Sequence, residues 1–172
     1  MTKIRATEVP ATSEIYRRLP GAYFYDCYEV PLPAEDADSS ALAFALQTFL
    51  HTPGWVELLM RLRNRLVRLV GLKDLGSFND FDRLKAASNY RVGDRIGIFS
   101  LRYLSENEVI LGDSDKHLDV QVSAFKSTRH GSPVFAVSTV VHVHNRLGKF
   151  YMFFVGPAHK VIAPATLRRK SL

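Results

Sequence analysis

The sequence predicts one domain of the α+β class, built on an antiparallel sheet of five to six strands. Helical spacing of apolar residues comes first, over about 41–70. Four β-rich runs separated by short turns follow between 96 and 145, and a helical pattern returns afterwards. Strands joined by short turns pair antiparallel, because parallel pairs need long crossovers. The 172 residues suit a single domain, which we place at 21–172 behind a loose lead-in over 1–20.

The first predicted elements are a strand and two helices. The strand covers 22–31, where aromatic residues are frequent and proline ends the run. A short apolar helix follows over 41–50, with Ser39 or Ser40 as its N-cap. The second helix, about 53–70, has Thr52 as its cap and Pro53 as its first residue. Its apolar stripe is expected to face the interior and its arginines the solvent. The stripe is Trp55, Leu58, Leu59, Leu62, Leu66, Leu69 and Val70, and the arginines are Arg61, Arg65 and Arg68.

The rest of the chain changes from irregular to strand and back to helix. Residues 72–92 are irregular, with Phe78, Phe81 and Leu84 expected against the core. A helix from Leu147 is apolar almost all round in its first half, so it is expected to be buried on most sides. Gly156-Pro157 is expected to break or kink it, because proline cannot donate to the preceding turn. A strand over 149–155 stays open as an alternative. The predicted strands of the middle region are 96–104, 108–113, 116–126 and 133–145.

The composition narrows the classes of function. Lys and Arg number 23 against 17 Asp and Glu, a net charge of +6, but no basic run is interleaved with aromatics, which disfavours nucleic-acid binding. No apolar run is long enough for a membrane span, and the first residues lack a signal-peptide pattern, which favours a cytoplasmic protein. The single cysteine, Cys27, excludes an internal disulfide and is expected to be a buried small hydrophobe. No phosphate loop or dinucleotide fingerprint occurs, and neither a cofactor nor a metal is expected.

Polar residues gather on one face of two neighbouring predicted strands, and three interpretations of them stay open. One is a metal site on His117, His142 and His144. Another is an acid–base pair, in which an Asp of the turn or strand orients a histidine. The favoured one is the solvated face of a half-exposed sheet. A one-residue change of register would swap the two faces and remove the cluster. The catalytic candidates are His117, Asp115, Asp119 and His144, with Asp113 as a further orienting carboxylate.

A second candidate site is an apolar pocket between the helix at 53–70, the sheet and the C-terminal helix. Ligand sites are typically apolar concavities with few polar groups. The alternative is that the aromatic residues pack in the core, which is the commoner role for any one of them. The aromatic candidates to line the pocket are Tyr23, Phe24, Tyr25, Trp55, Phe99, Phe135, Phe150, Tyr151 and Phe154.

Three segments, 52–72, 111–125 and 138–169, resemble the bacterial domain of unknown function 2867 family. The pattern is Leu-Gly-X-X-Asp-X-His-Leu-Asp, then Thr-X-Val followed by His-Asn-X-Leu-Gly-X-X-Tyr, then Pro-X-His. One departure is Ala158, where a larger apolar residue, often Phe, is expected. The pattern falls here on Asp115, His117, Asp119, Thr139, His144, Asn145, Gly148, Tyr151, Pro157 and His159. The ligand-binding candidates are Tyr25, Trp55, Phe99, Phe135, Asn145, Tyr151, Phe154 and His159.

The resemblance implies a helix-grip fold of the START/Bet v 1-like and polyketide-cyclase type, in which an antiparallel sheet wraps a long C-terminal helix over an apolar cavity. It implies a bacterial cytoplasmic protein, and similar modules occur fused behind NAD(P)-binding domains. The leading hypothesis is a module that binds a hydrophobic or amphipathic small molecule. One alternative is an enzyme of cyclase, hydrolase or isomerase type that uses a His/Asp acid–base pair. Another is an accessory domain that docks on an NAD(P)-dependent oxidoreductase partner, and a homodimer is also open.

Overall fold

A computed structural model describes residues 4–32, 38–69 and 85–168, apart from the side chains of 66–69. The expected core contacts of Phe78, Phe81 and Leu84 lie outside these residues, as do those of Leu66, Leu69 and Val70.

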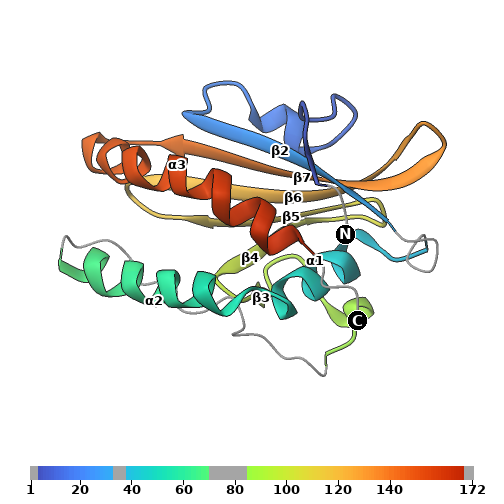
Figure 1. Ribbon diagram of the computed structural model, residues 1–172, viewed down its shortest axis with the longest axis horizontal. Helices are drawn as coiled ribbons and strands as arrows, with labels where there is room; N and C mark the ends of the chain where they lie inside the picture. Colours follow the sequence, from blue (N-terminus) through green and yellow to red (C-terminus); the bar gives the residue numbers. More distant parts are fainter. Residues whose placement is uncertain (1–3, 33–37, 70–84, 169–172) are drawn as a thin grey trace.

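The α+β prediction is confirmed: the strands form one antiparallel sheet, in the order β1-β2-β7-β6-β5-β4-β3 (Figure 1). The strands β3 to β7 form the predicted meander, and β2 joins its far edge by pairing with β7. The sheet has seven strands rather than five to six, because two of them are two-residue strands that alternation cannot reveal. The strands are β1 (Arg5–Ala6), β2 (Phe24–Pro31), β3 (Arg95–Ile96), β4 (Phe99–Leu104), β5 (Glu108–Ser114), β6 (Leu118–Arg129) and β7 (Ser132–Val143).

The hairpin of β6 and β7 sets the register of the central sheet. Its two turn residues, His130 and Gly131, both have positive φ angles, 49° and 78°. This is the two-residue turn whose twist matches that of paired strands, and glycine adopts its second position without strain. From this turn the pairing continues without interruption to Leu118 opposite Val143. Side chains therefore alternate between a concave and a convex face along both strands.

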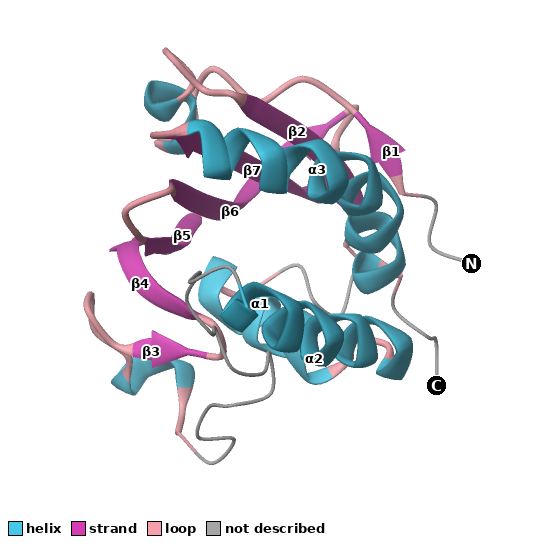
Figure 2. Cartoon of the chain, turned by 90° about the vertical axis from the view of Figure 1, so that its left-hand side faces the viewer, coloured by secondary structure: helices cyan, strands magenta, loops and turns pink. Residues whose placement is uncertain are grey.

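Three helices lie on the concave side of the sheet: α1 (Ala41–Leu50), α2 (Gly54–Leu69) and α3 (Arg146–Leu167) (Figure 2). The start of α1 is as predicted, because the Ser40 side chain accepts a hydrogen bond from the Ala43 N–H. The predicted start of α2 is wrong by one residue. The Pro53 carbonyl accepts the first helical bond, from Val56 N–H, and the buried Thr52 hydroxyl has no hydrogen-bond partner among the described residues. The described residues also form the short 3-10 helices η1 (Ile15–Arg18) and η3 (Ala87–Asn89).

Helix α3 runs without a break through Pro157, so the predicted break and the alternative strand over 149–155 are both wrong, while the kink given as the other outcome stays a prediction. The residue before a proline is normally disfavoured in a helix, because its Cβ meets the proline ring. That residue is Gly156, which has no Cβ. Gly156 avoids that clash at Pro157, whereas the second helical proline, Pro164, follows Ala163 and also lies inside α3.

Both long helices turn apolar side chains outward, contrary to expectation. In α3, Phe150, Phe153 and Phe154 are 64%, 71% and 60% exposed. In α2, the inward side carries Val56 and Asn64, and the described members of the predicted core stripe lie on the outside: Trp55, Leu58, Leu59 and Leu62. Periodicity identifies an apolar stripe on a helix but does not determine the direction in which the stripe points.

The hydrophobic core has two parts, one on each face of the sheet. On the concave face Phe44 of α1 stacks on Phe135 of β7, with ring centroids 4.1 Å apart. On the convex face the N-terminal segment covers a smaller cluster that includes Ile15 and Cys27. Cys27 is the buried small hydrophobe that was predicted, and burial, ahead of nearby carboxylates, raises the pKa of its thiol to about 11.

The stretch over 4–20, expected to be loose, is anchored to the sheet by a buried carboxylate. Glu108 of β5 accepts hydrogen bonds from the backbone N–H groups of Glu14 and Ile15, at 2.5 and 3.1 Å. The Ser123 hydroxyl donates a third bond to it at 2.7 Å. Glu108 is only 3% exposed, and the three hydrogen bonds compensate its carboxylate for the loss of hydration.

Candidate functional site

A pocket of about 230 Å³ lies between the concave face of the sheet and the three helices. Its walls are mostly aliphatic and aromatic side chains of β4 to β7, joined by residues from each helix. The volume is below the roughly 300–1,000 Å³ of sites for drug-sized ligands. It exceeds the cavity of about 150 Å³ that suffices to hold benzene. The space therefore suits a small molecule with one ring or a short chain.

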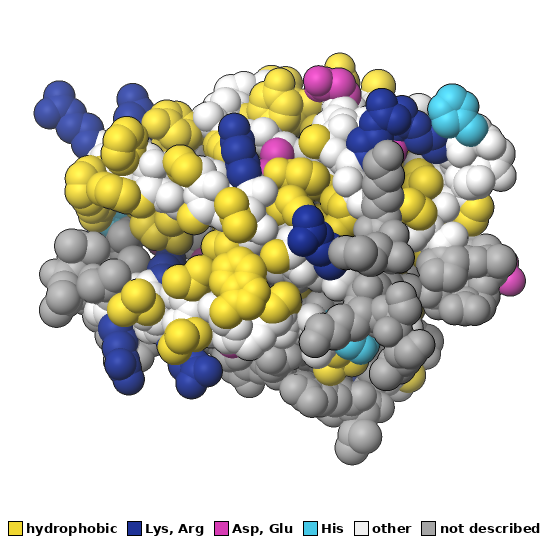
Figure 3. All heavy atoms as spheres, in the orientation of Figure 1, with side chains coloured by type: hydrophobic (Ala, Val, Ile, Leu, Met, Phe, Trp, Pro, Cys, Tyr) yellow, Lys and Arg dark blue, Asp and Glu magenta, His cyan; other side chains and the backbone are white. Residues whose placement is uncertain are grey.

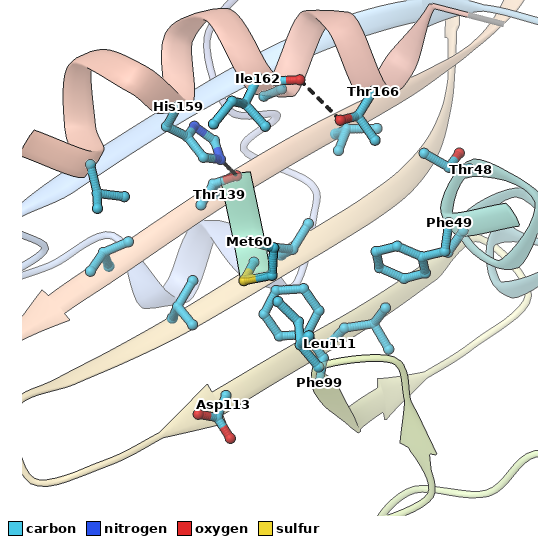
Figure 4. A pocket seen from close by; sticks show the side chains of 18 of the residues that line it. Thr48, Phe49, Met60, Phe99, Leu111, Asp113, Thr139, His159, Ile162 and Thr166 are labelled. Carbon is cyan, nitrogen blue, oxygen red and sulfur yellow. Dashed lines mark hydrogen bonds between the residues drawn. The ribbon is translucent and has the colours of Figure 1, made fainter. Parts of the chain in front are cut away.

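Two polar side chains of the pocket wall, His159 and Thr139, form a chain of hydrogen bonds with Asp26, which does not line the pocket. His159 of α3 points toward the sheet, where its Nδ1 lies 2.9 Å from Asp26 Oδ2. Its Nε2 lies 3.5 Å from Thr139 Oγ1, the contact drawn in Figure 4. The tautomer that satisfies both contacts donates from Nδ1 to the carboxylate and accepts from the hydroxyl at Nε2. His159 and Thr139 line the pocket, so an oriented imidazole and a hydroxyl meet a mostly apolar space.

The sheet register explains how this group forms. Asp26 of β2 pairs directly with Thr139 of β7, so both side chains leave the concave face at one level. The Phe24 ring stands edge-on to the His159 ring, with centroids 5.6 Å apart, and fixes the imidazole from the other side. Burial and the neighbouring Asp26 carboxylate together raise the pKa of Tyr28, two residues along β2. Asp26 thus contacts the His159 ring from β2 without itself lining the pocket.

A cationic contact joins α2 to α3 beside the pocket. Arg63 Nε donates to the Tyr151 hydroxyl at 3.2 Å, and the guanidinium lies 5.4 Å from the centre of that ring. Both residues line the pocket. At another part of the lining lies Asp113, at the end of β5 (Figure 4). Asp115, in the turn after β5, also lines the pocket. The pocket thus has an apolar interior with charge of both signs at separate points.

The structure brings three of the eight predicted ligand-binding residues to the pocket: Phe99, Tyr151 and His159. The other five lie elsewhere. Tyr25 lies on the convex side, because alternation in β2 puts it opposite Phe24. Phe135 is fully buried against Phe44 in the core. Trp55 and Phe154 are on the outward sides of α2 and α3, and Asn145 is the N-cap of α3.

The predicted catalytic residues His117 and Asp115 belong to a latch between the β5–β6 turn and the start of α3. Asp115 Oδ1 accepts the backbone N–H groups of His117 and Leu118 at 2.6 and 2.9 Å. His117 Nδ1 lies 2.9 Å from Asn145 Nδ2, and Asn145 Oδ1 caps the helix by accepting the Gly148 N–H at 3.0 Å. His117 is 8% exposed and does not line the pocket. A catalytic role for His117 stays a prediction. Its hydrogen bonds to Asp115 and Asn145 connect the β5–β6 turn to the start of α3.

Asp119, His142 and His144 lie on the convex side of the sheet. His144 Nε2 lies 3.2 Å from Asp119 Oδ2, and Asp119 pairs with His142 across the β6–β7 ladder. The sequence therefore correctly grouped these residues on one face, but that face is opposite the pocket. His142 Nε2 lies 3.2 Å from the Pro20 carbonyl. Within the described part of the chain, no three His, Cys, Asp or Glu side chains are arranged to hold a metal ion.

A family model described as protein of unknown function (DUF2867) matches residues 18–166. The chain belongs to the DUF2867 family. No curated protein and no solved structure matches the chain. In this DUF2867 protein, none of the described helices combines the length and apolarity needed to cross a membrane. The family description assigns no activity, so the function has to be argued from the pocket and the surface.

Sequence reasoning found His159 but missed its partner Asp26, which lies 133 residues away. A signal for Asp26 was present in the strand pattern. Phe24, Asp26 and Tyr28 share one face of β2, and a lone carboxylate on an aromatic face needs a partner when that face is buried. Thr139 was part of the family pattern, and its place beside His159 depends on how α3 crosses the sheet.

Proposed function

We propose that this DUF2867 protein binds a small amphipathic molecule in the concave pocket. Its apolar body would lie against the aliphatic walls of β4 to β7, and its polar end would face His159 and Thr139. The observation that carries the proposal is the combination of an apolar pocket with one oriented imidazole–hydroxyl pair on its wall. Such a division between apolar surface and a few placed polar groups is typical of small-molecule sites.

The size of the pocket defines the probe for a first test. We would titrate the protein with 4-propylphenol and with propylbenzene, and follow backbone amide signals by NMR. Both should saturate and perturb the amides of β6, β7 and the inner side of α3. The phenol should bind about 5-fold more tightly, because one hydrogen bond contributes roughly 1 kcal/mol. His159→Ala should remove that preference while leaving propylbenzene binding intact.

Two variants of β6 provide matched controls for the location. Val122→Phe puts a ring into the pocket, whereas Gln121→Phe puts the same ring on the opposite face of the strand. We expect Val122→Phe to abolish binding of both probes and Gln121→Phe to retain it. Saturable binding that survives Val122→Phe, or no saturable binding of either probe to the unmodified protein, would refute the proposal.

The pair of Asp26 and His159 also favours a second function, acid–base catalysis on a molecule held in the pocket. A carboxylate that orients an imidazole is the usual arrangement of a general base. His159 would take a proton from a carbon next to a carbonyl and return it, so the net reaction is proton exchange or isomerisation. In D₂O the enzyme would exchange the α protons of 4-phenyl-2-butanone faster than buffer does. Exchange that persists in both His159→Ala and Asp26→Asn, or no exchange above buffer, would rule this out.

A further inference from the structure

The outward sides of α2 and α3 carry an unusual amount of exposed apolar surface. Surface hydrophobic residues normally occur singly, and a contiguous group of them indicates an interaction site. Figure 3 shows hydrophobic side chains over both helices on one face of the molecule, with Lys and Arg side chains among them. The exposed apolar residues of this helical face are Trp55, Leu58, Leu59, Leu62, Phe150, Phe153, Phe154 and Val161.

The same two helices hold the positive charge of the protein. Within α2 and α3 seven residues are Lys or Arg and one, Glu57, is acidic, a surplus of six that equals the net charge of the whole chain. Among the basic residues Arg61, Arg65, Lys149 and Lys160 have exposed side chains. On each helix they lie next to the apolar residues rather than on the far side, because both groups occupy the half of the helix that faces away from the sheet.

We propose that this helical face docks on an anionic phospholipid surface. Helices that lie in a membrane interface present Trp, Phe and Leu to the acyl boundary and Lys or Arg to the headgroups beside them. The charge argues against a second copy of the chain as the occupant, since two such faces would bring like charges together. The exposed apolar side chains argue against a purely electrostatic partner.

If the helical face docks on a membrane, the membrane could supply the small amphipathic ligand proposed for the pocket. Both α2 and α3 contribute residues to the pocket wall, so a membrane on their outward sides would lie close to the pocket. The inference extends the proposed function, but it stands on outward side chains that do not line the pocket. Vesicle binding and pocket binding are measured separately, so either can fail without the other.

The test is flotation of the full chain with vesicles of phosphatidylcholine alone and of phosphatidylcholine with an equal part of phosphatidylglycerol. We expect binding to the anionic vesicles and little to the neutral ones, with binding reduced at high salt. Arg61→Glu with Arg65→Glu should weaken partitioning at least about 30-fold, since each basic residue near an anionic surface contributes roughly a fivefold increase. Leu58→Ser with Phe153→Ser should also abolish flotation, because it removes apolar side chains that would contact the acyl chains. Both side chains are more than half exposed in the free protein, so the double substitution should leave the fold intact.

Two control pairs make the same chemical changes away from the helical face. Arg18→Glu with Arg102→Glu changes the net charge equally, and Tyr23→Ser with Tyr25→Ser removes two half-exposed aromatic rings. Both pairs should float like the unmodified protein. The proposal is overturned if the protein floats with neither kind of vesicle, or if the controls lose binding as much as the helical-face variants. It is also overturned if sedimentation shows a dimer without lipid that Leu58→Ser with Phe153→Ser dissociates.

Discussion

Gly148, the third residue of α3, fits so closely under the β5–β6 turn that a single methyl group there should destabilise the fold. A Cβ at this position would lie 2.4 Å from the His117 carbonyl oxygen and 2.9 Å from Val143 Cγ1. The first of these is a backbone atom, so it cannot rotate away as the end of a flexible side chain would. In Gly148→Ala the start of α3 must therefore move away from the turn.

The size of the effect follows from two opposing contributions. Overpacking costs typically about 1–3 kcal/mol, and we expect the upper end because the obstacle is backbone. Alanine in place of glycine gains roughly 0.8–1 kcal/mol of helix propensity. The net loss is about 2 kcal/mol, and for a chain of this length each kcal/mol lowers Tm by about 2–4 °C. Gly148→Ala should therefore unfold about 4–8 °C below the unmodified protein.

Gly54→Ala is the matched control at the start of α2. No atom lies within 4 Å of a Cβ built there, so the same substitution should leave Tm unchanged or raise it slightly. The assay is thermal unfolding followed by circular dichroism, with urea unfolding as a second measure of the free energy. If Gly148→Ala were as stable as Gly54→Ala, the close approach of α3 to the His117 carbonyl would be refuted.

Three further predictions test other parts of the structure. Glu108→Gln should lower the free energy of unfolding by about 1–3 kcal/mol in urea titrations, because the amide replaces one acceptor that serves buried donors. Ser123→Ala removes a single donor to the same carboxylate and should lower the free energy of unfolding by less. Equal losses would contradict the role of Glu108 in holding the N-terminal segment on the sheet. Asn145→Ala should cost about 1 kcal/mol through loss of its cap, and Ser40→Ala should cost a similar amount at α1; an Asn145→Ala protein of full stability would contradict the latch. The pKa of Cys27, raised to about 11 by burial, keeps the thiol protonated in the folded state. The thiol should thus react with Ellman's reagent at pH 8 only after denaturant is added. Because the unfolded thiol ionises near pH 9.0 and the folded one near 11, the stability contributed by Cys27 should fall as the pH rises through this window, and Cys27→Ala should lack that fall.

The elements that sequence predicted well are those with local signals. Helix α1 has the bounds 41–50 that were predicted, because its serine cap and its last residues depend on neighbours in the chain. The strands β4 to β7 fall within a few residues of the predicted runs, because alternation and turn residues are also local. The break expected at Gly156-Pro157 is a local signal that failed, because α3 continues through both Pro157 and Pro164.

The candidate site was predictable only in part. His159, Tyr151 and Phe99 were expected at a ligand site and line the pocket, while the cluster around Asp119 was correctly grouped but lies on the convex face. Alternation tells which residues of a strand share a face. It does not tell which face the helices will cover, because that depends on contacts between distant segments.

By itself the sequence determined the class of fold, the family, the meander, the single buried cysteine and the positive charge of the chain. Each of these depends on composition or on neighbours within a few residues. Only the tertiary structure decided that Asp26 meets His159, and that α2 and α3 turn their apolar stripes outward. The contact of Asp26 with His159 depends on the register of β2 and β7 and on how α3 crosses the sheet. The outward direction of the apolar stripes depends on which side of each helix packs against the sheet. Both are packing choices made between segments far apart in the chain, where local periodicity carries no information.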